Sequence, residues 1–314
     1  MLFLLASSAS APAQQPPAAS AGKMKVDVTV VSLYCTVKDQ QGRLATNLQA
    51  SDFEVHEDGR RQQVRYFSRE SDRPLSLALL VDTSPSQKEV LPAEKEMAAQ
   101  FLKHVLRPTD QAMVMAFDAN VDLWQDLTPE LPRLQWALNR LKVNASRRLK
   151  PGEKAPAKAG ATRLYDAIHE AATQKLARSG ERRVIILLSD GVDSGSRMTE
   201  KQALEAAQRA DAIVYAIRFS DPAFYWRAAN RPGGGDEVLQ RLTKETGGRV
   251  LMPQDTKRLG EAFDHIASEL RSQYSLGYTP ANAARDGRFR RVHVRVKRDG
   301  HRVQSRSGYY APRP

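Results

Sequence analysis

The chain has 314 residues, of which 41% are hydrophobic and 27% are charged, and its formal net charge at pH 7 is +12. This is the composition of a globular protein long enough for one large domain and a smaller one. Cys35 is the single cysteine, which excludes an intramolecular disulfide, a cysteine zinc cluster and a Cys-x-x-Cys redox centre.

The first residues carry the pattern of an export signal. Met1 to Ala6 are mostly apolar, small residues continue to Ala13, and a Pro/Ala/Gln-rich stretch follows up to Lys23. The pattern resembles the tail of a secretory signal that is cleaved after Ala13, although no Lys or Arg precedes the apolar stretch. No later segment approaches the ~20 consecutive apolar residues of a membrane span. We expect residues 1–23 to be a signal-like segment with a disordered leader, and the protein to be exported to the periplasm or the extracellular space.

Residues 24–72 alternate between apolar and polar positions, which is typical of half-buried strands. The alternation changes phase at Val30-Val31, which predicts a bulge. Further along, Phe53 to Val55 and Val64 to Phe67 flank Asp58-Gly59, a strong signal for a hairpin turn. This part of the chain therefore predicts a small β unit.

Residues 73–272 change to apolar strands separated by amphipathic helices. The expected strands are residues 75–81, 112–117, 184–188, 213–219 and, more weakly, 249–252; the expected helices include residues 87–106, 162–176, 199–209, 236–246 and 256–274. Continuously apolar strands that alternate with helices favour an α/β fold with a doubly wound, mostly parallel sheet covered on both faces.

Residues 273–314 return to alternation, with Phe289 to Val296 and Val303 on either side of Asp299-Gly300. This predicts a second hairpin. Because a lone hairpin is marginal in water, we expect it to pack on the first β unit. The two ends of the chain would then form one small all-β, sandwich-like module, with the α/β domain inserted between its halves.

The end of the strand at residues 75–81 carries the main functional signal, the sequence Asp82-x-Ser84-x-Ser86. One carboxylate and two hydroxyls in a tight loop are hard oxygen ligands that suit a Mg²⁺-like ion. Thr162 opens a later helix, and Asp190 follows the strand at residues 184–188. Since ligands of doubly wound sheets bind beyond the carboxyl ends of the strands, we expect these side chains to converge there.

In order and spacing, Asp82, Ser84, Ser86, Thr162 and Asp190 resemble the metal-ion-dependent adhesion site of the von Willebrand factor type A family. The ends of the chain, including Gly308-Tyr309-Tyr310, are similar to a bacterial group called VWFA-related proteins. The resemblance implies a Rossmann-like fold and bound Mg²⁺, with Mn²⁺ or Ca²⁺ as alternatives. It also implies that the serines ligate the ion directly, that Thr162 does so in one state, and that the aspartates supply charge and orient water.

An enzymatic reading competes with this one. Phosphatases of the haloacid dehalogenase type also end their first strand on an aspartate and hold Mg²⁺ with later carboxylates. They generally carry a second acid two residues after the nucleophile, where this chain has Ser84, which cannot act as a general acid. The chain also lacks the Gly-x-Ser-x-Gly elbow of serine hydrolases. We therefore expect no catalysis.

Two insertions are expected beside the metal and are candidates for partner binding. Residues 144–159 are basic and include Arg147, Arg148 and Lys150, which would form a positive rim that steers an acidic ligand; a solvated loop is the alternative. Residues 220–235 include Tyr225 and Trp226, aromatic residues of the kind found at contact hot spots; packing onto the domain is the alternative.

We expect an exported, metal-dependent adhesion or assembly module whose protein partner supplies an acidic residue to the ion. The alternative is a structural envelope protein that binds anionic surfaces through its basic C-terminal module. From Arg285 to Pro314 the chain has ten Arg or Lys residues against Asp286 and Asp299. Nucleic acid is not expected as a partner, because the chain has no recognition motif and no row of exposed aromatic residues.

Overall fold

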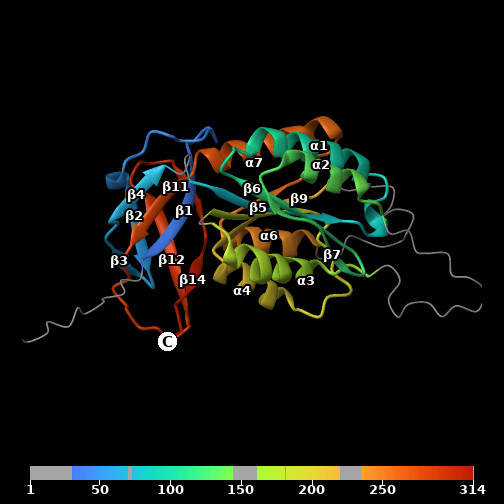
Figure 1. The fold of residues 1–314 in the computed structure, drawn as a ribbon. Helices are drawn as coiled ribbons and strands as arrows, with labels where there is room; N and C mark the ends of the chain where they lie inside the picture. Colours follow the sequence, from blue (N-terminus) through green and yellow to red (C-terminus); the bar gives the residue numbers. More distant parts are fainter. Residues whose placement is uncertain (1–29, 70–72, 144–160, 181, 220–234, 314) are drawn as a thin grey trace, which may run out of the picture.

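The computed structural model describes residues 30–69, 73–143, 161–180, 182–219 and 235–313. Within them the middle of the chain forms an α/β domain, and segments from both ends form a β sandwich beside it (Figure 1). This confirms the predicted fold class. The signal-like segment and leader, residues 1–23, lie outside the described residues.

A six-stranded sheet forms the centre of the α/β domain. Its strands are β5 (Leu75–Asp82), β6 (Gln111–Phe117), β7 (Val121–Thr128), β8 (Arg182–Leu188), β9 (Ala212–Ile217) and β10 (Val250–Leu251). They follow the order β10-β9-β8-β5-β6-β7, and every neighbouring pair is parallel except β6 and β7. All eight residues of β5 are buried, because the strand lies inside the sheet and helices cover both faces.

In the described part of the chain, helices cover both faces of this sheet, three on each (Figure 1). One face carries α1 (Leu91–Val105), α2 (Leu131–Arg140) and α7 (Thr256–Arg271); the other carries α3 (Leu164–Glu170), α4 (Glu200–Arg209) and α6 (Gly235–Thr246). The expected helix at residues 162–176 is divided, since a π-helical turn over Ala171–Lys175 follows α3.

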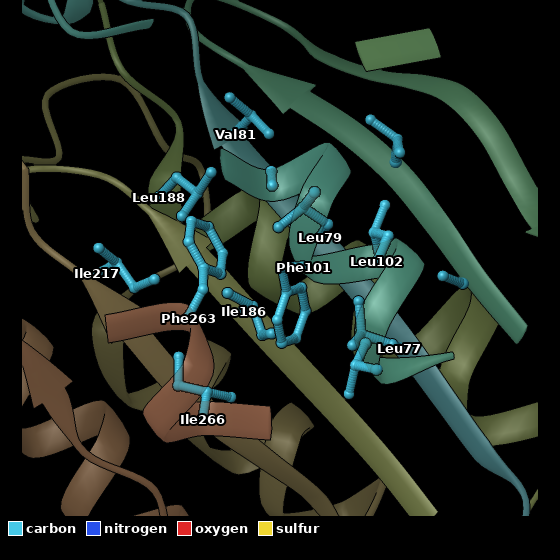
Figure 2. Close-up of a cluster of buried hydrophobic side chains, with 14 of the residues drawn as sticks. Leu77, Leu79, Val81, Phe101, Leu102, Ile186, Leu188, Ile217, Phe263 and Ile266 are labelled. Carbon is cyan, nitrogen blue, oxygen red and sulfur yellow. The ribbon is translucent and has the colours of Figure 1, made fainter. Parts of the chain in front are cut away.

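Alternate residues of β5 supply the two cores. Leu77, Leu79 and Val81 pack against α1 and α7, where the rings of Phe101 and Phe263 lie 5.1 Å apart (Figure 2). The residues between them point to the other face and pack against α3, α4 and α6. A strand buried on both faces must be apolar at every position, so its sequence is a continuous apolar run.

The pair β7 and α2 was not among the expected elements. Both sides of β7 are largely solvent-accessible, and its pairing with β6 shifts register twice. These irregularities remove the clean alternation by which a strand is detected in a sequence. As an antiparallel strand at the sheet edge, β7 does not need the apolar run that marks the buried parallel strands.

Two four-stranded antiparallel sheets form the β sandwich. One has the order β13-β1-β11-β4 and the other β14-β12-β2-β3. Their strands are β1 (Val31–Lys38), β2 (Phe53–Glu57), β3 (Arg60–Gln62), β4 (Tyr66–Arg69), β11 (Tyr274–Tyr278), β12 (Phe289–Val296), β13 (Arg302–Ser305) and β14 (Gly308–Tyr310). Inward-facing residues such as Leu33, Leu276 and Val294 fill the space between the sheets. The buried thiol of Cys35 is part of this core.

The two predicted hairpins had different outcomes. The turn at Asp58-Gly59 is confirmed, with both residues at positive φ as a tight hairpin turn requires. Its second strand is β3, however, and the residues at 66–69 pair with β11 in the other sheet. The hairpin around Asp299-Gly300 was wrong, because β12 pairs with β2 and β14 while β13 pairs with β1. The chain crosses between the two sheets there, and local alternation does not distinguish a crossing from a turn.

Polar contacts fix the sandwich against the α/β domain at the amino ends of the strands. Arg306 pairs with Asp211, which directly precedes β9, and donates a hydrogen bond to the Ser32 carbonyl oxygen at 2.8 Å. The buried Glu269 of α7 lies 2.9 Å from Lys38 Nζ and 2.7 Å from an Arg249 nitrogen. The carboxyl ends of the parallel strands therefore point away from the sandwich.

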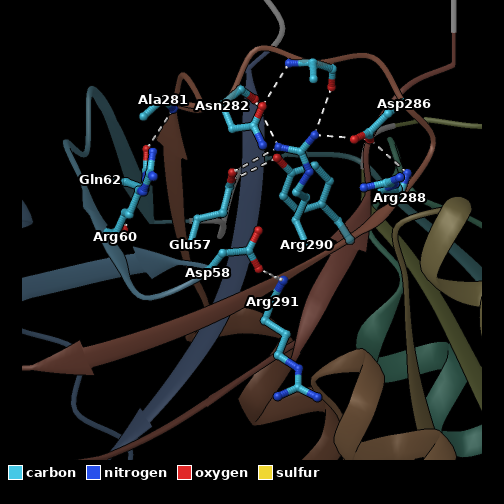
Figure 3. A network of polar contacts seen from close by, with 12 residues as sticks. Glu57, Asp58, Arg60, Gln62, Ala281, Asn282, Asp286, Arg288, Arg290 and Arg291 are labelled. Atoms are coloured by element: carbon cyan, nitrogen blue, oxygen red, sulfur yellow. Dashed lines mark hydrogen bonds and ion pairs between the residues drawn. The ribbon is translucent and has the colours of Figure 1, made fainter.

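A buried ion pair lies inside the sandwich (Figure 3). Glu57 and Arg290 are 3% and 2% exposed and lie 3.8 Å apart. Glu57 Oε2 also accepts hydrogen bonds from the hydroxyls of Tyr278 at 2.7 Å and Tyr309 at 2.9 Å. Burial, and then the hydrogen bond to Glu57, raise the pKa of Tyr278. The carboxylate thus holds together strands from both ends of the chain.

We expect Glu57→Ala to lower the free energy of unfolding by roughly 2–5 kcal/mol, because it leaves the buried hydroxyls of Tyr278 and Tyr309 without their acceptor and removes one of the two carboxylates paired with Arg290. Urea denaturation measures the change. The matched control is Glu54→Ala, which removes a carboxylate paired with the exposed Arg295 and should leave the midpoint nearly unchanged. Equal midpoints for both variants would contradict the assignment.

Candidate metal centre

The candidate site lies at the carboxyl ends of β5 and β8. These strands are neighbours, with Val81 opposite Leu188. Asp82 is the last residue of β5, and Asp190 follows the end of β8 by two residues. Parallel pairing therefore brings the two carboxylates to the same edge of the sheet, the edge at which doubly wound folds bind ligands.

Hydrogen bonds join the two aspartates through the loop after β5. Asp82 Oδ1 accepts a hydrogen bond from the Ser84 amide at 2.9 Å, and the hydroxyls of Ser84 and Ser86 lie 3.0 Å apart. The Ser86 hydroxyl then donates to Asp190 Oδ2 at 2.8 Å. The structure thus brings these four predicted residues together.

Thr162 lies at the same edge, but it is held by other contacts. Its amide donates to Ser194 Oγ at 3.0 Å, and the next residue donates to the Asp118 carbonyl oxygen at 2.9 Å. The Asp118 carboxylate in turn accepts a hydrogen bond from Thr83 Oγ1 at 2.8 Å. Thr162 therefore lies between the loops that follow β6 and β8. In the described residues, backbone hydrogen bonds place Thr162 at this edge, and its hydroxyl is not part of the hydrogen-bonded chain that runs from Asp82 through Ser84 and Ser86 to Asp190.

Two further residues complete the hydrogen bonding and were missed by the sequence analysis. Ser189 Oγ donates to Asp82 Oδ2 at 2.9 Å, and Gln87 Nε2 donates to Asp190 Oδ2 at 3.2 Å. The oxygen of the Gln87 side-chain amide, Oε1, is buried and has no hydrogen-bond partner among the described residues. Both residues directly adjoin motif residues, and this adjacency is the only sequence signal for them.

The loop after Asp190 is shaped by its backbone. Gly191 has φ +80°, and a Cβ there would lie 2.7 Å from Leu239 Cγ, so the position requires glycine. Asp193 accepts hydrogen bonds from the Ser196 hydroxyl at 2.5 Å and the Ser196 amide at 3.3 Å. It orders the loop that contacts Thr162.

The site is electrostatically unfavourable without a positive charge. Asp82 is fully buried, and burial followed by the nearby negative charge of Asp190 raises its pKa to about 7. No Lys or Arg is hydrogen-bonded to Asp82 within the described part of the chain. A bound cation would remove this cost, because it favours the charged form of both carboxylates.

Glu94, on α1, adds a third acidic group that the sequence analysis also missed. It is fully buried, and neither carboxylate oxygen has a hydrogen-bond partner in the described ranges. Burial, and then the charges of Asp82 and Asp190, raise its pKa well above the ordinary value. Its sequence signal is a charged residue on the apolar face of a helix, between Leu91 and Ala98.

The oxygen atoms at this edge fit a hard divalent cation. Hydroxyls and carboxylates are the donors that Mg²⁺ and Ca²⁺ prefer. Within the described residues, no three His, Cys, Asp or Glu side chains converge at metal-binding distance. The residues that could hold an ion are therefore the carboxylates of Asp82 and Asp190 with the hydroxyls of Ser84, Ser86 and Thr162, and water would complete the coordination.

The predicted partner-binding residues are not placed. Residues 144–160 and 220–234 lie outside the described residues, and with them the predicted contacts Arg147, Arg148, Lys150, Tyr225 and Trp226. Their position relative to the metal centre stays a prediction. The described chain resumes at Gly235, whose backbone packs against Asp190 and Gly191.

Comparisons with known proteins identify the family of this domain. A family model described as the von Willebrand factor type A domain matches residues 77–192, which include all five predicted metal residues. No curated protein matches the chain.

Solved structures give distant matches. Proximal thread matrix protein 1 from the mussel byssus, with a zinc-occupied MIDAS motif, is 12% identical with a TM-score of 0.49, covering 68% of this chain and 49% of that one. This chain thus spans about half of the mussel protein. BatB from Bacteroides thetaiotaomicron is 16% identical with a TM-score of 0.44, covering 62% and 98%. The PilB minor pilin from Streptococcus sanguinis is 11% identical with a TM-score of 0.45, covering 64% and 62%. On the family match and the arrangement of its strands and motif, this protein contains a von Willebrand factor type A domain.

Proposed function

We propose that this protein is a metal-dependent protein-binding module, used for adhesion or assembly, with Mg²⁺ as its ion and Mn²⁺ or Ca²⁺ as alternatives. The observation that carries the proposal is the hydrogen-bonded chain from Asp82 through Ser84 and Ser86 to Asp190. These hard oxygen donors lie where the sheet presents its ligands. The raised pKa of Asp82 supports it, because burial and the charge of Asp190 disfavour a negative charge on Asp82 that a bound cation would favour.

In this proposal the bound ion supplies an electrophilic centre for an acidic group of a partner. The hydroxyls of Ser84, Ser86 and Thr162 ligate without adding charge, and Asp82 and Asp190 contribute two negative charges. Ser189 and Gln87 orient the two carboxylates through their hydrogen bonds. An Asp or Glu of the partner protein would then be attracted to the edge and complete the coordination.

The proposed role does not involve catalysis. The second acid of a haloacid dehalogenase-type phosphatase would stand at Ser84, whose hydroxyl instead lies 3.0 Å from that of Ser86. A hydroxyl with the pKa of serine does not protonate a leaving group. The donor set supports holding an ion and gives no proton donor for phosphoryl transfer.

We further propose that the protein acts outside the cytoplasm, either in the periplasm or in the extracellular space. The support is the signal-like sequence that ends at Ala13. Among the helices of the described residues, none has the length and apolar character needed to cross a bilayer.

Mg²⁺ is expected to stabilise the wild-type protein by about 2.7 kcal/mol at a concentration 100 times its Kd. Thermal denaturation with Mg²⁺ or EDTA measures this, and Asp190→Asn should abolish the shift because it removes an acidic group of the site. The matched control is Asp264→Asn, an exposed aspartate on α7. A melting temperature independent of Mg²⁺ in the wild type would overturn the metal site.

The immobilised protein is expected to capture a partner from an envelope extract in Mg²⁺ but not in EDTA. Asp190→Asn should lose that partner while remaining folded, and Asp264→Asn should retain it. The purified partner should in turn lose binding when one of its own Asp or Glu residues is changed to Asn or Gln. Equal capture in Mg²⁺ and EDTA would remove the ion from the interaction.

A second candidate role, binding of an anionic envelope surface by the sandwich, has one observation in its favour. A pocket of about 520 Å³ opens on the outer face of β2 and β12 and is lined by His56, Arg291, His293 and Arg295, among others. The Arg291 side chain points away from the polar network of the sandwich (Figure 3). In the described part of the chain, the Arg291 guanidinium forms no salt bridge. An anion would complement this charge.

For this second role, we expect binding to vesicles that contain anionic lipid to weaken as salt increases. Arg291→Gln should reduce binding, whereas Arg133→Gln, a change at an exposed arginine of α2, should not. Cosedimentation with anionic and neutral vesicles measures the difference. Equal binding to both vesicle types would rule out electrostatic attachment.

A further inference from the structure

Glu94 lies on the buried face of α1, where the other residues are apolar. The buried side of the helix consists of Leu91, Ala98, Phe101, Leu102 and Val105 in addition to Glu94. A carboxylate is almost never fully buried unless it is paired. Packing alone would favour an apolar residue here, so the carboxylate needs another explanation.

Backbone hydrogen bonds align Glu94 with the metal loop. The Gln87 amide donates to the Ser84 carbonyl oxygen at 3.0 Å, the Val90 amide to the Gln87 carbonyl oxygen at 3.2 Å, and the Glu94 amide to the Val90 carbonyl oxygen at 3.0 Å. Residues linked in this way lie above one another on one side of a helical segment. Helical side chains lean toward the N-terminus, so the Glu94 carboxylate is directed toward the loop that contains Ser84 and Ser86.

Among the described residues, no Lys or Arg is paired with Glu94. The adjacent Lys95 donates to the carbonyl oxygens of Asn139 and Leu141, both at 2.8 Å, and thus faces α2. In the described part of the chain, both Glu94 oxygens and Gln87 Oε1 are buried acceptors without a donor. Buried polar atoms are normally paired, so three unpaired acceptors beside Asp190 indicate that a positive charge belongs there.

We infer that Glu94 is a third acidic group of the metal centre, which raises the affinity for the cation through its electric field. This inference rests on the proposed metal site. Glu94 acts at a distance and not as a ligand, because no three acidic side chains of the described residues converge at metal-binding distance. In a water-excluded interior, such a charge interacts strongly over several ångströms. Glu94 is thus a positioning residue that sets affinity and charge selectivity.

The field of Glu94 predicts a dependence on ion charge that a packing role would not produce. Coulomb energy is proportional to the charge of the bound ion. Tb³⁺ is similar in size to Ca²⁺ but carries three charges, so its Coulomb energy with Glu94 is one and a half times as large. If Glu94→Gln weakens Ca²⁺ binding by roughly tenfold, it should therefore weaken Tb³⁺ binding by roughly thirtyfold. A change that only distorted the site would not follow the charge of the ion.

Isothermal titration calorimetry of the full chain with Mg²⁺, Ca²⁺ and Tb³⁺ tests this inference. Glu94→Gln should weaken the binding of all three ions, and that of Tb³⁺ the most. Without metal, the variant should unfold at the same urea concentration as the wild type or at a higher one. The control is Glu96→Gln, which removes an exposed carboxylate from the same helix and should change neither property.

The possible failures are distinguishable. If the wild type binds the ions and Glu94→Gln binds them equally well, the role of Glu94 is overturned while the metal site stands. The same holds if the metal-free variant is less stable, since Glu94 would then have a structural role. If the wild type binds none of the three ions, the proposed function itself fails.

Discussion

The structure of the site depends on the parallel pairing of β5 with β8. This pairing places Asp82 and Asp190 at one edge of the sheet, where burial and the nearby charge of Asp190 disfavour the charged form of Asp82. Hydroxyls, backbone amides and the Gln87 side chain hold the two carboxylates in place. The fold therefore maintains an unfavourable concentration of negative charge, which is the condition for binding a cation selectively.

The apolar core stabilises the domain against the cost of the buried carboxylates. Residues of β5 are buried on both faces, and the helices α1 and α7 close over them through the contact of Phe101 with Phe263. Because the strand cannot shift against its neighbours without exposing this core, the loop at its end has a rigid base. Rigid support of this kind lets a functional loop tolerate buried charge that would destabilise a smaller domain.

The features that depend on local sequence pattern could be predicted. The features that depend on contacts between distant segments could not. The alternation of apolar strands and helices over residues 73–272 was sufficient to predict the doubly wound fold. Four of the five predicted metal residues lie together at its edge, while Thr162 is held there by backbone contacts. The partner of β12 could not be predicted, since alternation at Asp299-Gly300 is the same for a hairpin and for a crossing between sheets. Glu94 was missed because helical periodicity indicates which face is buried but not which charges lie opposite it.

The position of the sandwich has a mechanical consequence. Within the described residues, β5 begins and α7 ends at the end of the domain opposite the metal centre. A tensile load applied between a ligand at the metal and the sandwich would run lengthwise along β5. Its hydrogen bonds to β6 and β8 would then be loaded together in shear and would not open one after another. Strands loaded in this way resist separation, because many hydrogen bonds must break at once.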